Sequence, residues 1–156
     1  MDAVRPVGYS NCGDFFVVSN KKVKRPLTRT AAIKFTDKWF SLYIREKGHY
    51  VCFTCGKTAS RDDAIMSCGH LFSRVSFSTR WDEANAECQC TGCNMFHEHN
   101  PHRFTVAYIT KYGVHKYELL NIKHTKPFKI TTSEIILLGE HYKKLYEELK
   151  NGRQVG

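Results

Sequence analysis

A chain of 156 residues is long enough for one folded domain with its own hydrophobic core. Its 42% hydrophobic and 13% aromatic residues exclude global disorder. The net charge of +9 favours a polyanion as partner, because each Lys or Arg near a phosphate releases a condensed counterion. A solvated basic surface would give the same balance, so charge alone does not decide between the two.

The chain lacks the signals of membrane insertion and secretion. No apolar run approaches the roughly 20 residues of a membrane-spanning helix, and Met1–Arg5 does not begin an apolar secretion signal. Seven cysteines could indicate a secreted disulfide scaffold, but the number is odd. We therefore expect a cytoplasmic protein whose thiols stay reduced and bind metal.

We expect residues 1–29 to form a basic N-terminal arm, with one short strand at 15–18. A helix is predicted from about residue 30 to 47, ended by Gly48, because aromatic and aliphatic residues recur there at helical spacing. These residues are Ile33, Trp39, Phe40, Tyr43 and Ile44. Ordinary core packing explains this stripe better than a cofactor does.

The middle of the chain predicts short strands and metal-binding turns. Residues 49–55 suggest a strand that runs into a turn at Gly56, and 64–66 suggest a second strand. Residues 71–89 have few helix signals and predict a hairpin and loop. After Cys90 the pattern becomes helical. We expect a core unit over 30–125.

A helix broken by Pro101 is followed by helical patterns over 104–112 and 114–122. The segment 126–156 is expected to carry the last helix, which packs on the core or lies at a dimer interface. Thr131 and Glu134 have the spacing of a capping box. The apolar face that follows consists of Ile135, Leu138, Tyr142, Leu145, Tyr146 and Leu149.

Two CxxC pairs are the most specific chemical signal in the chain. Cys52 and Cys55 form the first, and Cys90 and Cys93 form the second. Four thiolates at this spacing make a closed tetrahedral site for structural Zn²⁺, which would contribute to folding free energy.

Other cysteines leave the choice of ligands partly open. Cys88 lies close enough to the second pair to replace a member, but Cys90 and Cys93 have the usual spacing. Cys68 and Cys12 are interpreted as ordinary thiols.

Three further segments carry a family resemblance. They are Cys68–Arg74, Thr79–Asn85 and Gln89–Asn94, and they follow the run Cys-x-x-Cys-Gly. Together they resemble the bacteriophage NinG (Rap) recombination endonuclease family. The likeness extends over residues 30 to 150 and leaves out the N-terminal arm.

This resemblance implies an α+β fold with a zinc-stabilised treble-clef or ββα-metal (HNH-like) core and flanking helices. It implies a DNA endonuclease that uses Mg²⁺ or Mn²⁺ to hydrolyse phosphodiester bonds in branched DNA, such as Holliday junctions and D-loops. It also implies action in the cytoplasm of an infected bacterium, with phage or host recombination proteins as partners.

The resemblance assigns a role to each residue of the HNH pattern. His70 would be the general base, for which neutral imidazole suits pH 7, and would also belong to the catalytic cation site. Asn94 would bind that cation, and Asn85 would fix the loop that aims the histidine. Core, turn or capping roles are the ordinary alternatives for these residues.

Basic residues near this pattern are candidates for DNA contacts. Arg74 and Arg80 are expected to hold phosphate oxygens, and Arg74 to assist catalysis. Lys57 and Arg103 are further candidates for DNA binding. Each of them could equally be a solvated surface charge.

One position departs from the family pattern. Many HNH sites carry an Asp just before the catalytic histidine, where this chain has Gly69. Substitutes could come from Asp82, Glu83, His97 or His99, or the cation could be held mainly by Asn94, phosphate and water.

Two other functions compete with the nuclease. A non-catalytic zinc module that binds nucleic acid or protein has the same charge and cysteines, but it does not need a general base at His70. A thiol redox protein would use Cys52 and Cys55 alone, which the second pair argues against. A homodimer through the last helix is compatible with branch recognition, although such apolar faces more often pack on their own core.

Overall fold

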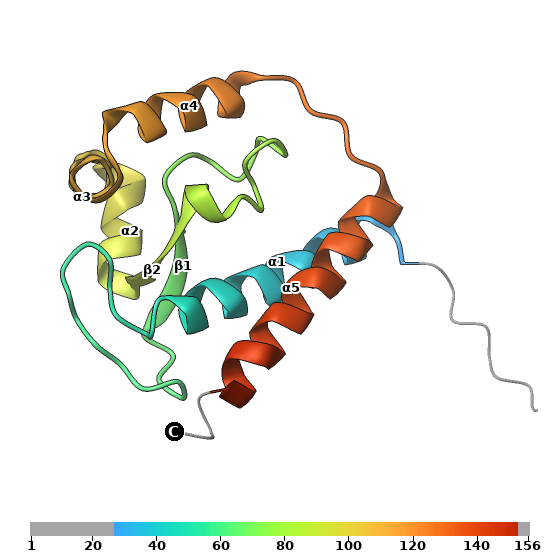
Figure 1. Cartoon of the computed structure of the whole chain (residues 1–156), viewed down its shortest axis with the longest axis horizontal. Helices are drawn as coiled ribbons and strands as arrows, with labels where there is room; N and C mark the ends of the chain where they lie inside the picture. The colour runs from blue at the N-terminus through green and yellow to red at the C-terminus, as the bar shows by residue number, and fades with distance from the viewer. Residues whose placement is uncertain (1–26, 153–156) are drawn as a thin grey trace, which may run out of the picture.

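The computed structural model describes residues 27–152 and shows a mixed α+β architecture (Figure 1). The predicted strand at 15–18 and most of the predicted arm lie outside the described residues. The elements in chain order are α1 (Arg29–Lys47), β1 (Met66–His70), the short 3₁₀ helix η1 (Glu83–Asn85), β2 (Ala86–Cys90), α2 (Thr91–His99), α3 (His102–Tyr112), α4 (Val114–Thr125) and α5 (Thr132–Gly152).

The helices α1 and α5 cross in close contact, although they lie at opposite ends of the described chain (Figure 1). Gly139 of α5 makes the approach possible, because a Cβ there would lie 2.6 Å from the Phe35 ring. The Thr36 hydroxyl lies 2.7 Å from the carbonyl oxygen of Ile135. The last helix therefore packs on the core, the first of the two predicted alternatives.

The predicted capping box begins α5. The Thr131 N–H donates to the Glu134 carboxylate at 2.7 Å, and the Glu134 N–H donates to the Thr131 hydroxyl at 3.2 Å. These reciprocal bonds satisfy N–H groups that have no partner within the helix.

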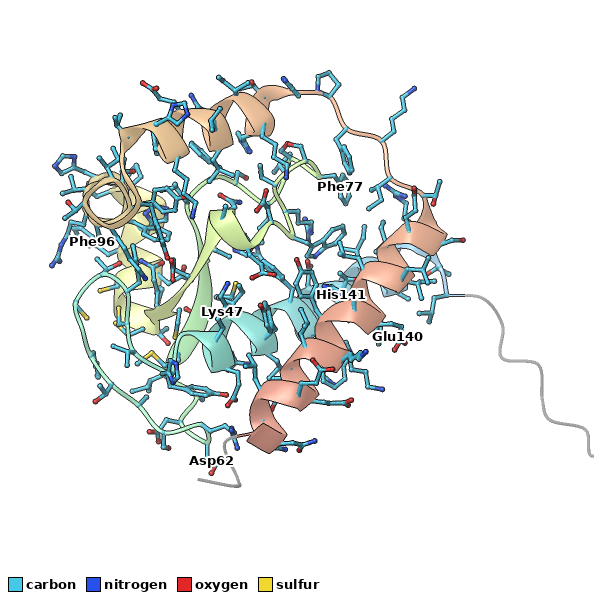
Figure 2. All side chains as sticks on the ribbon, in the orientation of Figure 1. Lys47, Asp62, Phe77, Phe96, Glu140 and His141 are labelled. Atoms are coloured by element: carbon cyan, nitrogen blue, oxygen red, sulfur yellow. The ribbon has the colours of Figure 1, made fainter. Side chains whose placement is uncertain are left out.

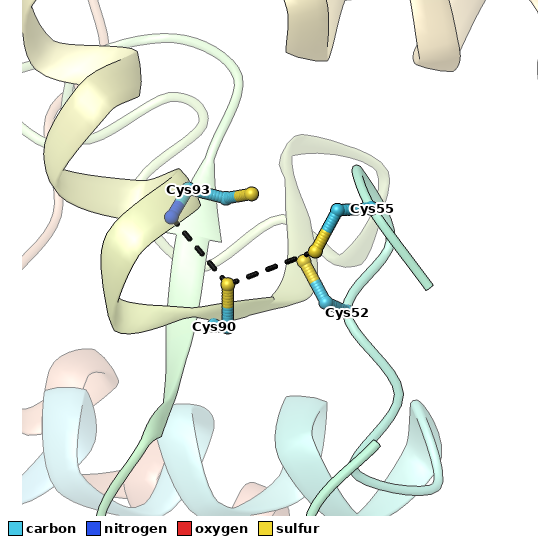
Figure 3. A group of neighbouring side chains, drawn as sticks. All are labelled: Cys52, Cys55, Cys90 and Cys93. Atoms are coloured by element: carbon cyan, nitrogen blue, oxygen red, sulfur yellow. Dashed lines mark hydrogen bonds between the residues drawn. The ribbon is translucent and has the colours of Figure 1, made fainter. Parts of the chain in front are cut away.

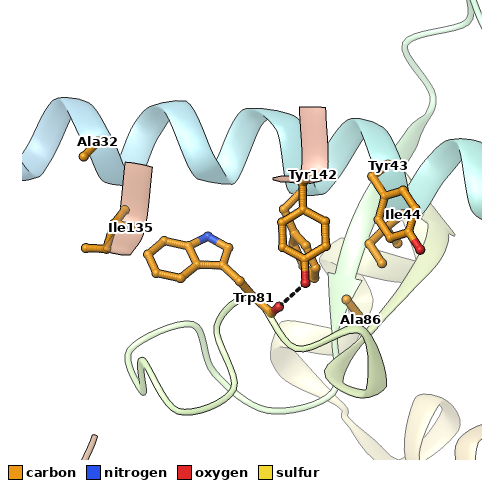
Figure 4. Close-up of a cluster of buried hydrophobic side chains, with 8 residues drawn as sticks. Ala32, Tyr43, Ile44, Trp81, Ala86, Ile135 and Tyr142 are labelled. Carbon is orange, nitrogen blue, oxygen red and sulfur yellow. Dashed lines mark hydrogen bonds between the residues drawn. The ribbon is translucent and has the colours of Figure 1, made fainter. Parts of the chain in front are cut away.

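The main hydrophobic cluster lies between α1, α5 and the loop that follows β1 (Figure 4). Trp81 enters it from the loop, and the Tyr142 hydroxyl donates to the Trp81 carbonyl oxygen at 2.7 Å. The buried members are Ala32, Phe40, Tyr43, Ile44, Trp81, Ala86, Ile135 and Tyr142. The predicted apolar faces of both helices are confirmed, and they hold this loop in place.

The two strands form an antiparallel ribbon in which Cys68 pairs with Cys88, and His70 with Ala86. The sequence predicted only hairpin and loop over residues 71–89, so β2 is a correction. Residues Ala86–Cys90 are almost wholly buried, which hides the alternation that usually marks a strand. His70 stands at the end of β1 with its ring 5.8 Å from that of Phe40.

The predicted strand at 49–55 is wrong. His49 and Tyr50 take left-handed backbone conformations, with φ of 54° and 56°, and the segment forms only an isolated bridge from Val51 to Thr58. Buried Glu46 anchors this segment, because its carboxylate accepts hydrogen bonds from the Arg61 guanidinium and the Tyr50 hydroxyl. The backbone N–H groups of His49 and Tyr50 also donate to the carbonyl oxygens of Glu46 and Arg45, so this segment continues the end of α1 and does not begin a strand.

Helix α2 packs on both strands, α3 packs on α2, and α4 follows α3 along the top of the molecule in Figure 1. Their small core contains Leu71, Phe104, Tyr108 and Leu120. Figure 2 shows Phe96 of α2 at the periphery, where it is half exposed. Between residues 27 and 152, the helices are too short or too polar to cross a bilayer.

Substitution at the α1–α5 crossing tests the packing. We expect Gly139→Ala to lower the free energy of unfolding by about 1–3 kcal/mol, since the new methyl group would overlap the Phe35 ring. Gly152→Ala in the same helix is the matched control, because a Cβ there meets no atom within 4 Å among the described residues. Urea unfolding of the two variants measures the difference. Equal stability of Gly139→Ala and wild type would contradict the packing.

Candidate functional site

The four cysteines of the two CxxC pairs come together at one point. The sulfur atoms of Cys52, Cys55, Cys90 and Cys93 all lie within 4.8 Å of one another (Figure 3). The first pair approaches from the loop after α1, and the second from the junction of β2 and α2. The predicted grouping of these four residues is confirmed.

Local backbone geometry shapes both halves of this cysteine cluster. Cys52 and Lys57 close a turn through the Cys52 N–H, which donates to the Lys57 carbonyl oxygen at 2.7 Å. Gly56 within that turn has φ of 74°, a conformation that favours glycine. Cys90 caps α2, and its sulfur accepts the Cys93 N–H at 3.5 Å.

The donor set suits a structural metal such as zinc. Tetrahedral Zn²⁺ with Zn–S bonds of about 2.3 Å places its sulfurs about 3.8 Å apart. The sulfurs of Cys55 and Cys90 are 3.8 Å apart. Although burial opposes ionisation of Cys52, backbone N–H groups of Cys90, Cys55 and Thr54 lower its pKa to about 7.

The remaining described cysteines lie outside this cluster. Cys68 and Cys88 pair across the two strands, on the side of the sheet that α1 covers. Burial raises the pKa of both thiols, that of Cys88 to about 11. Cys88 is buried and Cys68 is partly buried, and neither belongs to the cluster of four. Cys12 lies outside the described residues.

A cleft of about 810 Å³ runs beside β1 between α1 and α2. We call it the His70 cleft. Its polar lining includes Asp37, His70, Arg74, Arg80, Asn94 and His97. The structure therefore brings together His70, Asn94 and both predicted arginines.

The His70 ring is held in one tautomer. Its Nε2 lies 3.1 Å from the carbonyl oxygen of Arg80, which can only accept a hydrogen bond. In the neutral ring that makes this bond, Nε2 carries the proton and Nδ1 does not, while the Cys68 backbone also interacts with the ring. Burial, with a further contribution from the positive charge of Arg74, lowers the pKa of His70 to about 4, so the ring is neutral at pH 7.

Asn85 fastens the loop between the two strands. Its side chain is fully buried and accepts the Phe72 N–H at 2.8 Å. Its amide nitrogen donates to the carbonyl oxygens of Phe72 and Thr79 at 3.0 Å. The predicted task of fixing the loop next to His70 fits these bonds. Asn85 is not among the residues that line the cleft.

The two arginines of the cleft differ in what they bind. Arg80 presents its guanidinium to Asp37, with N–O distances of 2.6 and 3.0 Å, and donates to the Arg74 carbonyl oxygen. Its fork is thus occupied by a carboxylate, so a phosphate at Arg80 would have to compete with Asp37, and the predicted DNA contact stays a prediction. The exposed Arg74 side chain lies at the cleft.

Lys57 and Arg103 are placed away from the His70 cleft. Lys57 is exposed on the cysteine-bearing loop. Arg103 is exposed at the start of α3, beside a much smaller cavity. Any DNA contact they make would lie outside the His70 cleft.

The two acidic candidates for a cation ligand point elsewhere. Asp82 caps η1 and binds Lys123 at 2.5 Å, while Glu83 accepts from Lys47 at 2.6 Å and from the Tyr43 hydroxyl. Both line a different hollow beside α3. They cannot replace the missing carboxylate from these positions.

Of the two histidine candidates, His97 lines the His70 cleft. Its Nε2 lies 3.1 Å from the His70 carbonyl oxygen. The side chain of His99 is outside the described part of the structure.

Steric crowding by a neighbouring side chain explains why position 69 is glycine, where many HNH sites have Asp. A Cβ on Gly69 would lie 1.9 Å from Oε1 of Gln89, whose side chain crosses over the glycine from β2. Gln89 is fully buried, and its amide nitrogen donates to the Thr54 hydroxyl at 2.6 Å. The space for a side chain before His70 is therefore already filled.

Sequence reasoning missed Asp37 and Gln89. Asp37 lies in α1, far from the motifs in the chain, so no local spacing connects it to the cleft. The position of Gln89 follows from strand alternation and register, which required β2 to be recognised first. Gly69 was the signal that could have indicated this contact, since a glycine within a strand often marks the close approach of another group.

The fold and the cluster define a small α+β protein with four cysteines that could hold a metal such as zinc. Residues 18–152 match the model of the family described as bacteriophage lambda NinG protein. Because the match spans most of the chain, the protein belongs to the NinG family. No curated protein and no solved structure matches the chain.

Removal of a cluster thiol should release the metal. We expect Cys90→Ser to hold less than one zinc per chain and to unfold, because structural zinc contributes roughly 10–16 kcal/mol in small zinc domains. Cys88→Ala, a buried neighbour outside the cluster, should keep its zinc. Metal analysis and thermal unfolding make the comparison. Zinc loss from Cys88→Ala with retention in Cys90→Ser would show that the ligands are wrongly assigned.

The contact between Gly69 and Gln89 can be measured by a double-mutant cycle. Gly69→Ala alone should cost about 1–3 kcal/mol of stability, because the methyl group collides with a buried side chain. In a Gln89→Ala background the same change should cost much less. Additive effects in urea unfolding would mean that the two residues do not share this space.

Proposed function

We propose that the chain is a metal-dependent endonuclease that hydrolyses phosphodiester bonds in branched DNA, such as Holliday junctions and D-loops. The observation that carries the proposal is one cleft lined by His70, Asn94 and Arg74. Membership of the NinG family and the order strand, strand, helix around the cysteine cluster support it. That order is the one a ββα-metal core requires.

His70 acts as the general base in this proposal. Hydrolysis needs a group that takes a proton from the attacking water, and neutral imidazole with a free nitrogen is suited to it. The hydrogen bond from Nε2 to the Arg80 carbonyl oxygen leaves Nδ1 as that nitrogen. Asn85 supports the arrangement indirectly, by tying down the loop that ends near Arg80.

The catalytic Mg²⁺ or Mn²⁺ is held mainly by Asn94, a DNA phosphate and water. Asn94 lies in the first turn of α2, and among the side chains and backbone that the structure describes its amide has no hydrogen-bond partner. Asp37 is the carboxylate in the cleft, but it accepts hydrogen bonds from Arg80 and from the Trp81 indole at 2.8 Å. With so few protein ligands, the cation binds weakly until DNA supplies a phosphate.

Arg74 holds a phosphate oxygen of the substrate. Its side chain is exposed, and its charge faces the same cleft as His70. The protein would act in the cytoplasm of an infected bacterium, beside phage or host recombination proteins. We also propose a homodimer. Helix α5 buries its apolar face on α1, so that face would not form the dimer interface.

A nicking assay tests the proposal. Zinc-loaded protein with Mg²⁺ or Mn²⁺ should cut a four-way DNA junction faster than a linear duplex. His70→Ala should bind the junction as wild type does and cut it at least about 100-fold more slowly, the usual effect of losing a general base. His115→Ala is the matched control, since His115 is exposed on α4 and is not among the residues of the cleft.

The assay also separates the competing function. Equal cutting by His70→Ala and wild type would refute the assigned mechanism. A wild-type protein that binds the junction but cuts no substrate with either cation would instead be a non-catalytic zinc module.

A further inference from the structure

Two buried acceptor atoms belong to side chains that line one small cavity, which shares His97 with the His70 cleft. Oε1 of Gln89 and Nδ1 of His97 are both inaccessible to solvent, and neither has a hydrogen-bond partner among the described residues. Their side chains line the same cavity, together with Asn100 and Arg103. Buried acceptors left without a donor destabilise the folded state, so native proteins rarely leave them unpaired.

The hydrogen bond from His97 to the His70 carbonyl oxygen shows that the cavity must contain a hydrogen-bond donor. Nε2 of His97 donates to the His70 carbonyl oxygen at 3.1 Å, so Nε2 holds the proton of the neutral ring. Nδ1 then needs a donor. Oε1 of Gln89 also needs one, because the amide nitrogen already donates to Thr54 at 2.6 Å. Two acceptors cannot satisfy each other.

The cavity is large enough for only one small molecule. Its volume is about 10 Å³, room for a single water and not for a larger ligand. A water donates two hydrogen bonds, one for each acceptor.

We infer that a buried water bridges Gln89 and His97, and that His97 is a positioning residue for His70. The water fixes the His97 tautomer, and His97 in turn holds the peptide of His70. On the other side, Gln89 binds Thr54, which lies between Cys52 and Cys55. A continuous series of hydrogen bonds thus connects the cysteine cluster to the candidate base.

The water and the tautomer can be tested without catalysis. In the zinc-loaded wild type, nitrogen NMR of His97 should show Nε2 protonated and Nδ1 unprotonated at pH 7. A crystal structure should show a water within hydrogen-bond distance of Gln89 Oε1 and His97 Nδ1. A protonated Nδ1, an empty cavity or a metal ion in it would overturn the inference.

The positioning role rests on the proposed function and needs a kinetic test. His97→Phe keeps the ring against Phe104 but removes both nitrogens. We expect it to lower kcat for junction cleavage by about 10- to 100-fold with unchanged junction affinity, as loss of supporting contacts does at metal sites. His97→Gln, which keeps a donor and an acceptor, should recover part of the rate. His102→Phe, at an exposed histidine of α3, is the control.

The cleavage rates distinguish failure of the positioning role from failure of the proposed nuclease function. If the wild type cuts but His97→Phe cuts equally fast, the positioning role is wrong. If His97→Gln is as slow as His97→Phe, the hydrogen bonds are not what matters, and the role is again wrong. If the wild type does not cut at all, the proposed function and the positioning role fall together, while NMR and crystallography still decide the water.

Discussion

The meeting of four thiols at one point is the constraint on which the site depends. Four ionised sulfurs within 4.8 Å would repel one another, so a bound divalent cation is the natural means of holding them together. Segments 35 residues apart are joined here, with Cys55 on one side and Cys90 on the other. Other bonds also hold the loop after α1, among them those from Arg61 to buried Glu46, from Gln89 to Thr54 and from the Phe53 N–H to the Cys88 carbonyl oxygen.

The elements β2 and α2 connect the cysteine cluster to the His70 cleft. Cys90 ends β2, and the pairing of β2 with β1 places His70 opposite Ala86. The same cysteine caps α2, whose first turn carries Asn94. The cluster therefore orients both candidate groups without lining the cleft.

The opposite wall of the cleft is set by α1 and α5. Asp37 of α1 holds Arg80 and Trp81 of the loop, and Tyr142 of α5 fixes the Trp81 peptide. The Arg80 carbonyl oxygen in turn accepts from His70. Helix α5, at the far end of the chain, thus helps to position the peptide group that binds His70 Nε2.

What could be predicted from sequence was local. The apolar faces of α1 and α5, the capping box at Thr131 and the CxxC pairs each depend on residues close together in the chain, so their spacing identified them. The grouping of His70 with Asn94 was expected from the family resemblance and not from the residue pattern alone.

The errors arose at the end of α1 and in β2. The left-handed His49 and Tyr50 donate backbone hydrogen bonds to the last turn of α1, where a strand was expected, and β2 is buried too evenly to show alternation. The ion pair of Arg80 with Asp37 could not be predicted, because the two residues are 43 positions apart in the chain.

Anomalous diffraction from Mn²⁺ would test the central claim most directly. Crystals of zinc-loaded His70→Ala protein with branched DNA would keep the substrate uncut. We predict a manganese peak in the His70 cleft, bound by the Asn94 amide oxygen and a DNA phosphate, and separate from the zinc at the four cysteines. DNA bound with its phosphates outside this cleft, and no manganese beside Asn94, would contradict a nuclease site there.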